Sequence, residues 1–200
     1  IKPLIITQSN LWLALALIKL QQTNKAKKII RELEKLNFDS EINLFISQDC
    51  ERKVEISIAD NDYDVQTTPD ENKKYFSDDQ ALAIIVYKFL NEEEKAKRLS
   101  ESVINSELYD NKTGLFNRNF DKTETNKTKT SYKNGLMGIA LGMMGYEKEL
   151  DKLNNSMINM LYDKNESLFN FSDSDLTKVP DNSFLALLSI GFKDLKHKLF

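Results

Sequence analysis

Residues 109–116 read Tyr-Asp-Asn-Lys-Thr-Gly-Leu-Phe, and the same pattern recurs at residues 38–45 and 162–169. Each copy holds an aromatic residue, an aspartate, three variable residues, a small or turn-forming residue, and then Leu-Phe. We expect the aspartate to cap a turn, the sixth residue to be left-handed, and the aromatic residue and Leu-Phe to enter the core. The sixth residues are Asn43, Gly114 and Ser167. Three copies of one turn indicate a repeat architecture.

Two helical patterns precede each turn. The first is apolar on most faces, which is typical of an inner, buried helix. It occurs at residues 11–20, 81–90 and 135–144. The second is amphipathic, as in residues 24–37, and predicts a half-exposed outer helix. A fourth pair is expected at residues 183–200, which gives about four hairpins in a single domain spanning residues 1–200.

Polar residues stand at the start of each inner helix. They are Ser9 or Asn10, the run Ser77-Asp78-Asp79, Asn134, and Asp181 or Asn182. Short polar side chains accept hydrogen bonds from the first free amides of a helix, so we expect these residues to be N-caps. Gly135, Gly138 and Gly142 weaken the third inner helix relative to alanine, and this pattern predicts a close packing contact along it.

One segment departs from the helical pattern. Val54, Ile56 and Ile58 alternate with polar residues, which predicts a strand. We expect a β-hairpin insertion near residues 50–68 and a polar loop at residues 117–130. The fold class is therefore mainly α, with antiparallel helical hairpins and one small β-hairpin insertion. Connectors of unequal length between equal helix pairs are often where a repeat protein carries its function.

Composition excludes several classes of function. The net charge of −3 offers no basic face for nucleic acid, and no apolar run approaches the ~20 residues that span a bilayer. Cys50 is the only cysteine and His197 the only histidine, so a cage of several thiolates or imidazoles is ruled out. We predict no metal site and no cofactor. Ile1 indicates a processed or cropped N-terminus, and the sequence fits a cytoplasmic or an exported protein equally.

These residues resemble a known superfamily. An apolar inner helix opened by Asp or Asn, an amphipathic outer helix and an aromatic-Asp-x-x-x-Gly-Leu-Phe turn are similar to the six-hairpin glycosidase-like (α/α) toroids. The resemblance implies a toroid, or a partial toroid because four hairpins stand where the family ring has six. It also implies carbohydrate processing. The histidine pair of the sugar epimerases is missing from this chain.

In such a toroid the N-terminal ends of the inner helices meet around a central cavity. The resemblance implies that Asp79 and Asp181 act there as general acid and base on a glycosidic bond, with Asp78 as a substitute. The expected substrate-binding residues are Asn10, Trp12, Asp78, Tyr132 and Asn134. The structural alternative is that the polar residues are only caps and the aromatic residues only core.

Two functional hypotheses follow from this reasoning. The first is an enzyme with glycoside hydrolase-type chemistry acting on a carbohydrate ligand. The second is a non-catalytic helical-repeat module that binds a protein or glycan through its long-loop face, including the insertion near residues 50–68. The partners considered are a carbohydrate ligand, a protein, and a second copy of the chain that would complete the ring.

Overall fold

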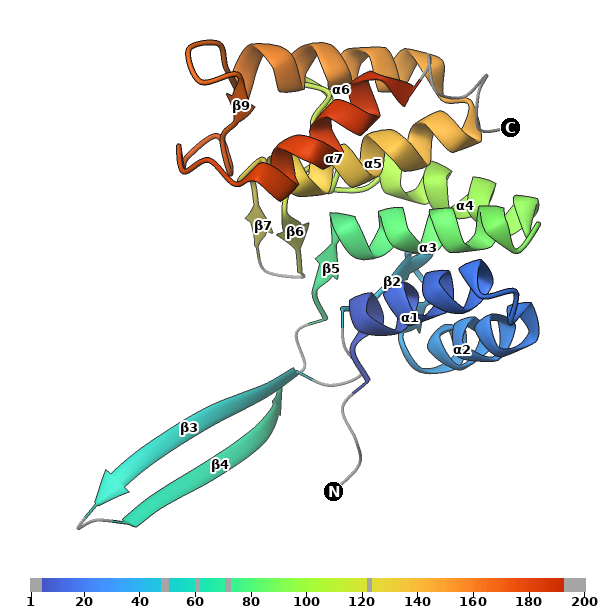
Figure 1. Cartoon of the computed structure of the whole chain (residues 1–200). Helices are drawn as coiled ribbons and strands as arrows, with labels where there is room; N and C mark the ends of the chain where they lie inside the picture. The colour runs from blue at the N-terminus through green and yellow to red at the C-terminus, as the bar shows by residue number, and fades with distance from the viewer. Residues whose placement is uncertain (1–4, 48–50, 60–61, 71–72, 122–123, 193–200) are drawn as a thin grey trace.

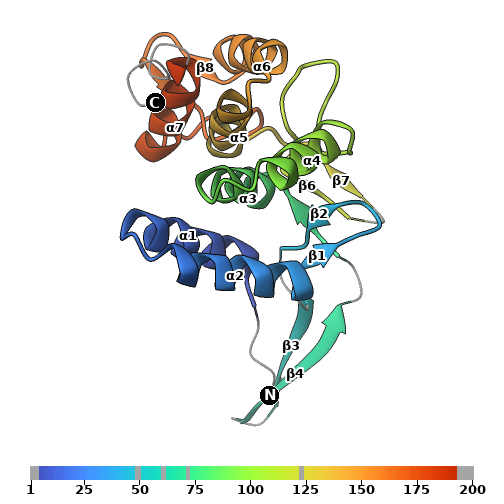
Figure 2. The ribbon, with the colours of Figure 1, turned by 90° about the vertical axis from the view of Figure 1, so that its right-hand side faces the viewer.

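The computed structural model describes residues 5–47, 51–59, 62–70, 73–121 and 124–192. Four inner helices pack side by side in chain order, and three outer helices cover them from one side (Figures 1 and 2). The inner helices are α1 (Thr7–Lys19), α3 (Ser77–Phe89), α5 (Ser131–Met144) and α7 (Pro180–Ile190). The outer helices are α2 (Thr23–Leu36), α4 (Glu93–Ile104) and α6 (Glu147–Met160). The predicted helical hairpins are thus confirmed, while the outer helix expected after α7 lies outside the described residues.

The inner helices begin three or four residues before their apolar patterns. Their N-caps are Ile6, Phe76, Thr130 and Val179, and none of these makes a side-chain capping hydrogen bond. The prediction that Asn10, Asp79, Asn134 and Asp181 are N-caps is therefore wrong, because all four lie inside the first helical turn. The first helical turn of these helices consists mainly of polar residues, although it is largely buried in α3 and α5. The spacing of apolar residues therefore does not reveal it.

The three repeated turns have the predicted geometry. Asn43, Gly114 and Ser167 adopt positive φ angles of 56°, 78° and 56°. Each aspartate accepts a hydrogen bond from the backbone N–H two residues later, at 3.0, 2.9 and 2.9 Å. The first aromatic ring and the last phenylalanine ring of each turn lie 5.0–5.1 Å apart, centroid to centroid. Short ladders close two of the turns: β1 (Phe38–Asp39) with β2 (Leu44–Phe45), and β8 (Tyr162–Asp163) with β9 (Leu168–Phe169).

Each turn docks onto the inner helix that follows it. The backbone N–H of its last phenylalanine donates to the side chain of the fourth helical residue. The pairs are Phe45 with Gln80 Oε1 at 2.8 Å, Phe116 with Asn134 Oδ1 at 2.7 Å, and Phe169 with Ser183 Oγ at 2.8 Å. These bonds satisfy buried backbone groups at the junction between hairpins, which explains why a polar residue stands at that position.

The turns are also held by lysines from the connectors. The pairs are Lys73 with Asp39 at 2.6 Å, Lys129 with Asp110 at 3.2 Å, and Lys178 with Asp163 at 3.0 Å. Each aspartate of the repeat therefore binds a backbone amide and a lysine, and Asp39 also accepts a hydrogen bond from Tyr75 Oη at 2.9 Å.

The β-structure lies in the connectors. Strands β3 (Glu51–Ala59) and β4 (Asp62–Asp70) pair antiparallel along their whole length, which confirms the hairpin insertion. This ribbon runs away from the helices (Figure 1). Strands β5 (Tyr75–Phe76), β6 (Asn119–Phe120) and β7 (Thr125–Asn126) form a small sheet where a loop was predicted at residues 117–130. Two-residue strands are too short to leave a period-two pattern, so the sequence does not reveal them.

The two ends of the inner layer differ from its middle. In α3 every residue from Ser77 to Tyr87 is buried. The prediction that α1 is buried nearly all round is wrong, since Trp12 is 44% and Leu13 51% exposed. At the other end Phe184 of α7 is 61% exposed. Within the described ranges, α1 and α7 each have one inner neighbour, whereas α3 and α5 each have two.

Helices α5 and α7 pack closely, as the glycines predicted. A Cβ on Gly135 would lie 2.7 Å from the Leu185 carbonyl carbon, too close for any other residue. Gly138 faces Ser189 and Gly142 faces Phe192 in the same way. Among the described residues, no helix has the length and apolar character needed to cross a membrane.

Candidate functional site

The first turns of three inner helices bring polar side chains together. Asp78 of α3 is 4% exposed, and its Oδ1 is paired with Lys133 Nζ of α5. Its Oδ2 accepts a hydrogen bond from Gln8 Nε2 of α1 at 2.6 Å. A buried carboxylate is stable as an ion only when charge and hydrogen bonds compensate its desolvation, and both are supplied here. Asp78 is therefore fixed by groups from the helices on either side.

Asp79, the next residue, lies in different surroundings. It is 2% exposed, and its Oδ2 has no hydrogen-bond partner within the described protein. Burial raises the pKa of Asp79 well above its ordinary value, and the Asp78 charge raises it further, while Lys133 and a Ser47 hydrogen bond oppose both effects. The folded protein thus favours the protonated form of Asp79.

Two carboxyl groups in unlike surroundings can divide the roles of acid and base. A buried carboxyl with a raised pKa can donate a proton near neutral pH, while an ionised neighbour can act as base, nucleophile or electrostatic stabiliser. Both groups sit at the N-terminal end of α3, where the helix dipole favours negative charge. The dipole therefore stabilises an ionised Asp78 and opposes the protonation of Asp79, which burial and the Asp78 charge favour.

Aromatic side chains flank the two carboxyls. Burial raises the pKa of Tyr132, and the Asp78 charge raises it further, whereas a hydrogen bond with Trp12 lowers it. Trp12, of α1, is 44% exposed and leaves part of its indole available to a ligand. Lys133 Nζ lies 4.6 Å from the centroid of the Phe76 ring. Predicted residues Trp12, Asp78, Asp79 and Tyr132 therefore gather at one place.

A polar hollow of about 380 Å³ adjoins this cluster through Phe76. Its other lining residues are Lys74, Arg118, Asn119, Asp121, Glu124 and Asn126. They come from the connectors and the β5–β6–β7 sheet, so this hollow lies on the loop side of the helices.

Three predicted site residues lie elsewhere. Asn134 is fully buried, and its side chain binds the backbone of Phe116 and Thr130. Asn10 lines a groove between α1 and α2, which neither acid lines. Asp181 is exposed on the first turn of α7, which packs against α5. The structure therefore places Asp78, not Asp181, beside Asp79.

Sequence reasoning missed Gln8, Ser47 and Lys133. Lys133 carried a signal, since a lysine next to the start of an apolar helix needs an acidic partner if it is buried. Gln8 and Ser47 have no comparable signal in the sequence, because their position beside the acids depends on how separate hairpins pack.

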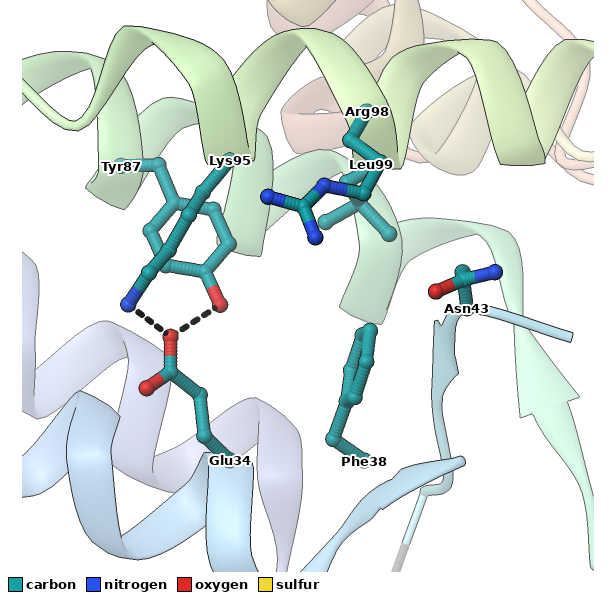
Figure 3. A pocket seen from close by; sticks show the side chains of 7 residues that line it. All are labelled: Glu34, Phe38, Asn43, Tyr87, Lys95, Arg98 and Leu99. Carbon is teal, nitrogen blue, oxygen red and sulfur yellow. Dashed lines mark hydrogen bonds and ion pairs between the residues drawn. The ribbon is translucent and has the colours of Figure 1, made fainter. Parts of the chain in front are cut away.

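A better enclosed hollow of about 210 Å³ lies between the first two hairpins (Figure 3). Glu34 accepts hydrogen bonds there from Tyr87 Oη at 2.8 Å and Lys95 Nζ at 2.6 Å, and Figure 3 shows all three meeting. Phe38 and Asn43 of the first turn form its opposite wall. Glu34, the carboxylate of this hollow, is already bound by Lys95 and Tyr87, so we assign the hollow to the docking of the turn and not to catalysis. Within the described ranges, no group of three or more His, Cys, Asp or Glu side chains could hold a metal ion, and Cys50 and His197 lie outside those ranges.

The fold of this chain is similar to that of solved (α/α)-toroid proteins, as the sequence predicted. A glycoside hydrolase family 76 α-mannanase from Bacteroides thetaiotaomicron superposes over 98% of this chain and 53% of its own, with TM-score 0.72 and 14% identity. A sugar epimerase from a ruminal bacterium gives TM-score 0.63 at 14% identity over 93% of this chain and 54% of its own. The chain thus spans about half the length of these structures. No family model matches the sequence, and no curated protein does.

A third structure is similar in fold. It is an inactive variant of an α-1,6-mannanase of Salegentibacter sp., with two consecutive aspartates changed to asparagine, in complex with α-1,6-mannotriose. It superposes on 80% of this chain and 48% of its own, with TM-score 0.55 and 16% identity.

Proposed function

We propose that this protein processes carbohydrate, with Asp79 as general acid and Asp78 as the ionised carboxylate of a glycoside hydrolase-type reaction. The observation that carries the proposal is the pair of consecutive buried carboxyls with opposite environments at the start of α3. Asp78 has a lysine and an amide donor, whereas Asp79 keeps one oxygen without a donor in the described protein. Hydrolysis of a glycosidic bond needs this division between an acid and a second carboxylate.

The surroundings support a sugar as the substrate class. The exposed part of Trp12 offers a flat apolar face, and Tyr132 adds a second ring close to the acids. The comparisons add a first probe, since an α-1,6-mannanase with two consecutive aspartates altered binds α-1,6-mannotriose. We therefore propose an α-linked manno-oligosaccharide as the first ligand to test.

The test measures binding and turnover separately. The 200-residue chain is titrated with α-1,6-mannotriose by calorimetry, and release of reducing ends is followed with longer α-1,6-mannan. We expect Asp78→Asn and Asp79→Asn to keep binding and to lower turnover by at least about 100-fold, the scale of general acid–base catalysis. Trp12→Ala should weaken binding without a comparable fall in the turnover of bound substrate.

Asp181→Asn is the matched control, since it makes the same change at an exposed carboxyl on another inner helix. We expect it to keep turnover. Loss of turnover in Asp181→Asn but not in Asp78→Asn would make Asp181 the partner of Asp79. Binding without turnover in the unaltered chain would instead favour a non-catalytic glycan-binding module.

A further inference from the structure

The groove on the first hairpin, between α1 and α2, is equivalent to the site on the second hairpin, α3 and α4, where the first aromatic turn docks. Asn10 is the fourth residue of α1, the position at which Gln80, Asn134 and Ser183 hold the preceding turn. Its Nδ2 donates to the Ile6 carbonyl at 2.8 Å, as Asn134 Nδ2 donates to the Thr130 carbonyl at 2.9 Å. In Asn134 the amide oxygen then accepts the N–H of a turn phenylalanine. Within the described part of the chain, no donor reaches the corresponding oxygen of Asn10.

The two sites are lined by side chains at four equivalent helix positions. The hollow beside the first turn is lined by the eleventh residue of α3 and by the third, sixth and seventh residues of α4 (Figure 3). These are Tyr87, Lys95, Arg98 and Leu99. The groove on the first hairpin, of about 550 Å³, is lined by the same positions of α1 and α2. These are Leu17, Lys25, Lys28 and Ile29, together with Asn10 and others.

The third hairpin shows what the basic residue at the sixth position does. Lys152, the sixth residue of α6, donates to the Asn111 carbonyl of the second turn at 2.5 Å. Lys28 holds this position in α2, where it is exposed and shares the groove with Glu32. Its ammonium has the charge that a turn carbonyl or a turn aspartate would bind. Leu17 and Ile29 form an apolar surface at the bottom of the groove. The aromatic, leucine and phenylalanine side chains of a repeated turn need such a surface to pack against.

We propose that this groove binds one more aromatic turn of the same type, from a helical hairpin that packs beside α1 and α2. The occupant carries an aromatic residue, an aspartate, three variable residues, a small residue and Leu-Phe. Its last phenylalanine N–H donates to Asn10 Oδ1, and its carbonyls accept from Lys28. The three turns of this chain are already docked on α3, α5 and α7, so the occupant is a fourth turn that these 200 residues do not supply.

The probe is a cyclic peptide of residues 108–117. Its ends are joined because they lie side by side in the protein, where the Asn117 N–H donates to the Leu108 carbonyl at 2.7 Å. Titration into ¹⁵N-labelled protein should give saturable NMR shifts at Leu17, at Lys28 and at the Asn10 side-chain amide. A small turn supports a Kd on the order of 1 mM, which this measurement reaches. Asn10→Leu should weaken binding about tenfold, since it leaves a turn N–H unpaired.

Matched variants separate the groove from the rest of the surface. Ile29→Glu should abolish the shifts, whereas Arg31→Glu, an exposed position of α2 outside the groove, should leave them unchanged. A peptide with alanine at both aromatic positions should not bind. The proposal is overturned by no shifts with the native peptide, by equal shifts with the alanine peptide, or by shifts at another face. Groove shifts caused by α-1,6-mannotriose, or by raising the protein concentration alone, would assign the groove to a sugar or a second copy and would also overturn it.

Discussion

At the scale of single residues, the environment of each carboxyl decides what it can do. Asp78 and Asp79 have the same chemistry and adjacent positions, yet it is Asp78 whose two oxygens bind the side chains of Lys133 and Gln8. Asp79 is left buried beside a negative charge. The same contrast makes two stability measurements informative.

Asp79→Asn should stabilise the folded protein at neutral pH. The folded pKa of Asp79 is raised above its ordinary value of 3.8, so the stability it provides is present below that value and is lost as the pH rises through the folded pKa. Asparagine does not ionise and avoids this loss. The gain in unfolding free energy, measured by urea denaturation at several pH values, should vanish near pH 3 and grow above about pH 4. A gain that does not depend on pH would contradict the assignment of a raised pKa.

Lys133→Met should destabilise the protein by about 3–5 kcal/mol, because it leaves the buried Asp78 charge without its cation. The control is Lys88→Met, which breaks the ion pair of Lys88 with Glu93, whose side chains are 31% and 54% exposed. That change should cost less than about 1 kcal/mol. Equal effects of the two changes in urea denaturation would show that Lys133 does not compensate a buried charge.

At the scale of elements, the turn is the unit that organises the fold. One eight-residue pattern sets a left-handed residue, an Asx turn and an aromatic pair, and its last amide binds the next helix. The same turn thus ends one hairpin and positions the following one. This is why the helix pairs keep a constant length while the connectors vary.

Gly114→Ala should destabilise the protein by about 1–2 kcal/mol, the usual cost of a left-handed non-glycine residue. Its φ is +78°, and the added Cβ would also meet the stem of Lys152. Ser167→Gly is the reverse change at the equivalent exposed position, where φ is 56°, and it should not destabilise. Urea denaturation of both variants provides the measurement. A neutral Gly114→Ala would mean that the turn relaxes into another conformation.

At the scale of the whole molecule, the chain forms an open arc of hairpins. Trp12 and Leu13 are exposed at one end and Phe184 and Leu187 at the other, while α3 in the interior is almost fully buried. The arc corresponds to about half the length of the toroid enzymes that it superposes on. The candidate acids lie in α3, which packs between α1 and α5.

The ribbon of β3 and β4 should contribute little to the stability of the arc. Its strands pair with each other, and the ribbon projects from the helices (Figure 1). Replacing residues 51–70 by a short Gly-Ser linker should change the unfolding free energy by less than about 1 kcal/mol. A loss above about 2 kcal/mol in urea denaturation would show that the ribbon packs on the helical body. If mannotriose binding fell while stability held, the ribbon would be part of the ligand site.

The sequence by itself determined the repeat, the helix pairs, the conformation of the turns, the inserted ribbon and the close contact along Gly135 and Gly138. Each of these is a local property, since periodicity and backbone preference act within a few residues. Only the tertiary structure decided that Asp78 is paired with Lys133, that Asp79 is not, and that Asn134 serves the backbone of Phe116. These outcomes depend on which helices are neighbours, because charge compensation and burial are set by groups distant in sequence. Asp79 and Asp181 look alike in sequence as helix-start acids, and they differ because α3 has an inner neighbour on both sides whereas α7 has one.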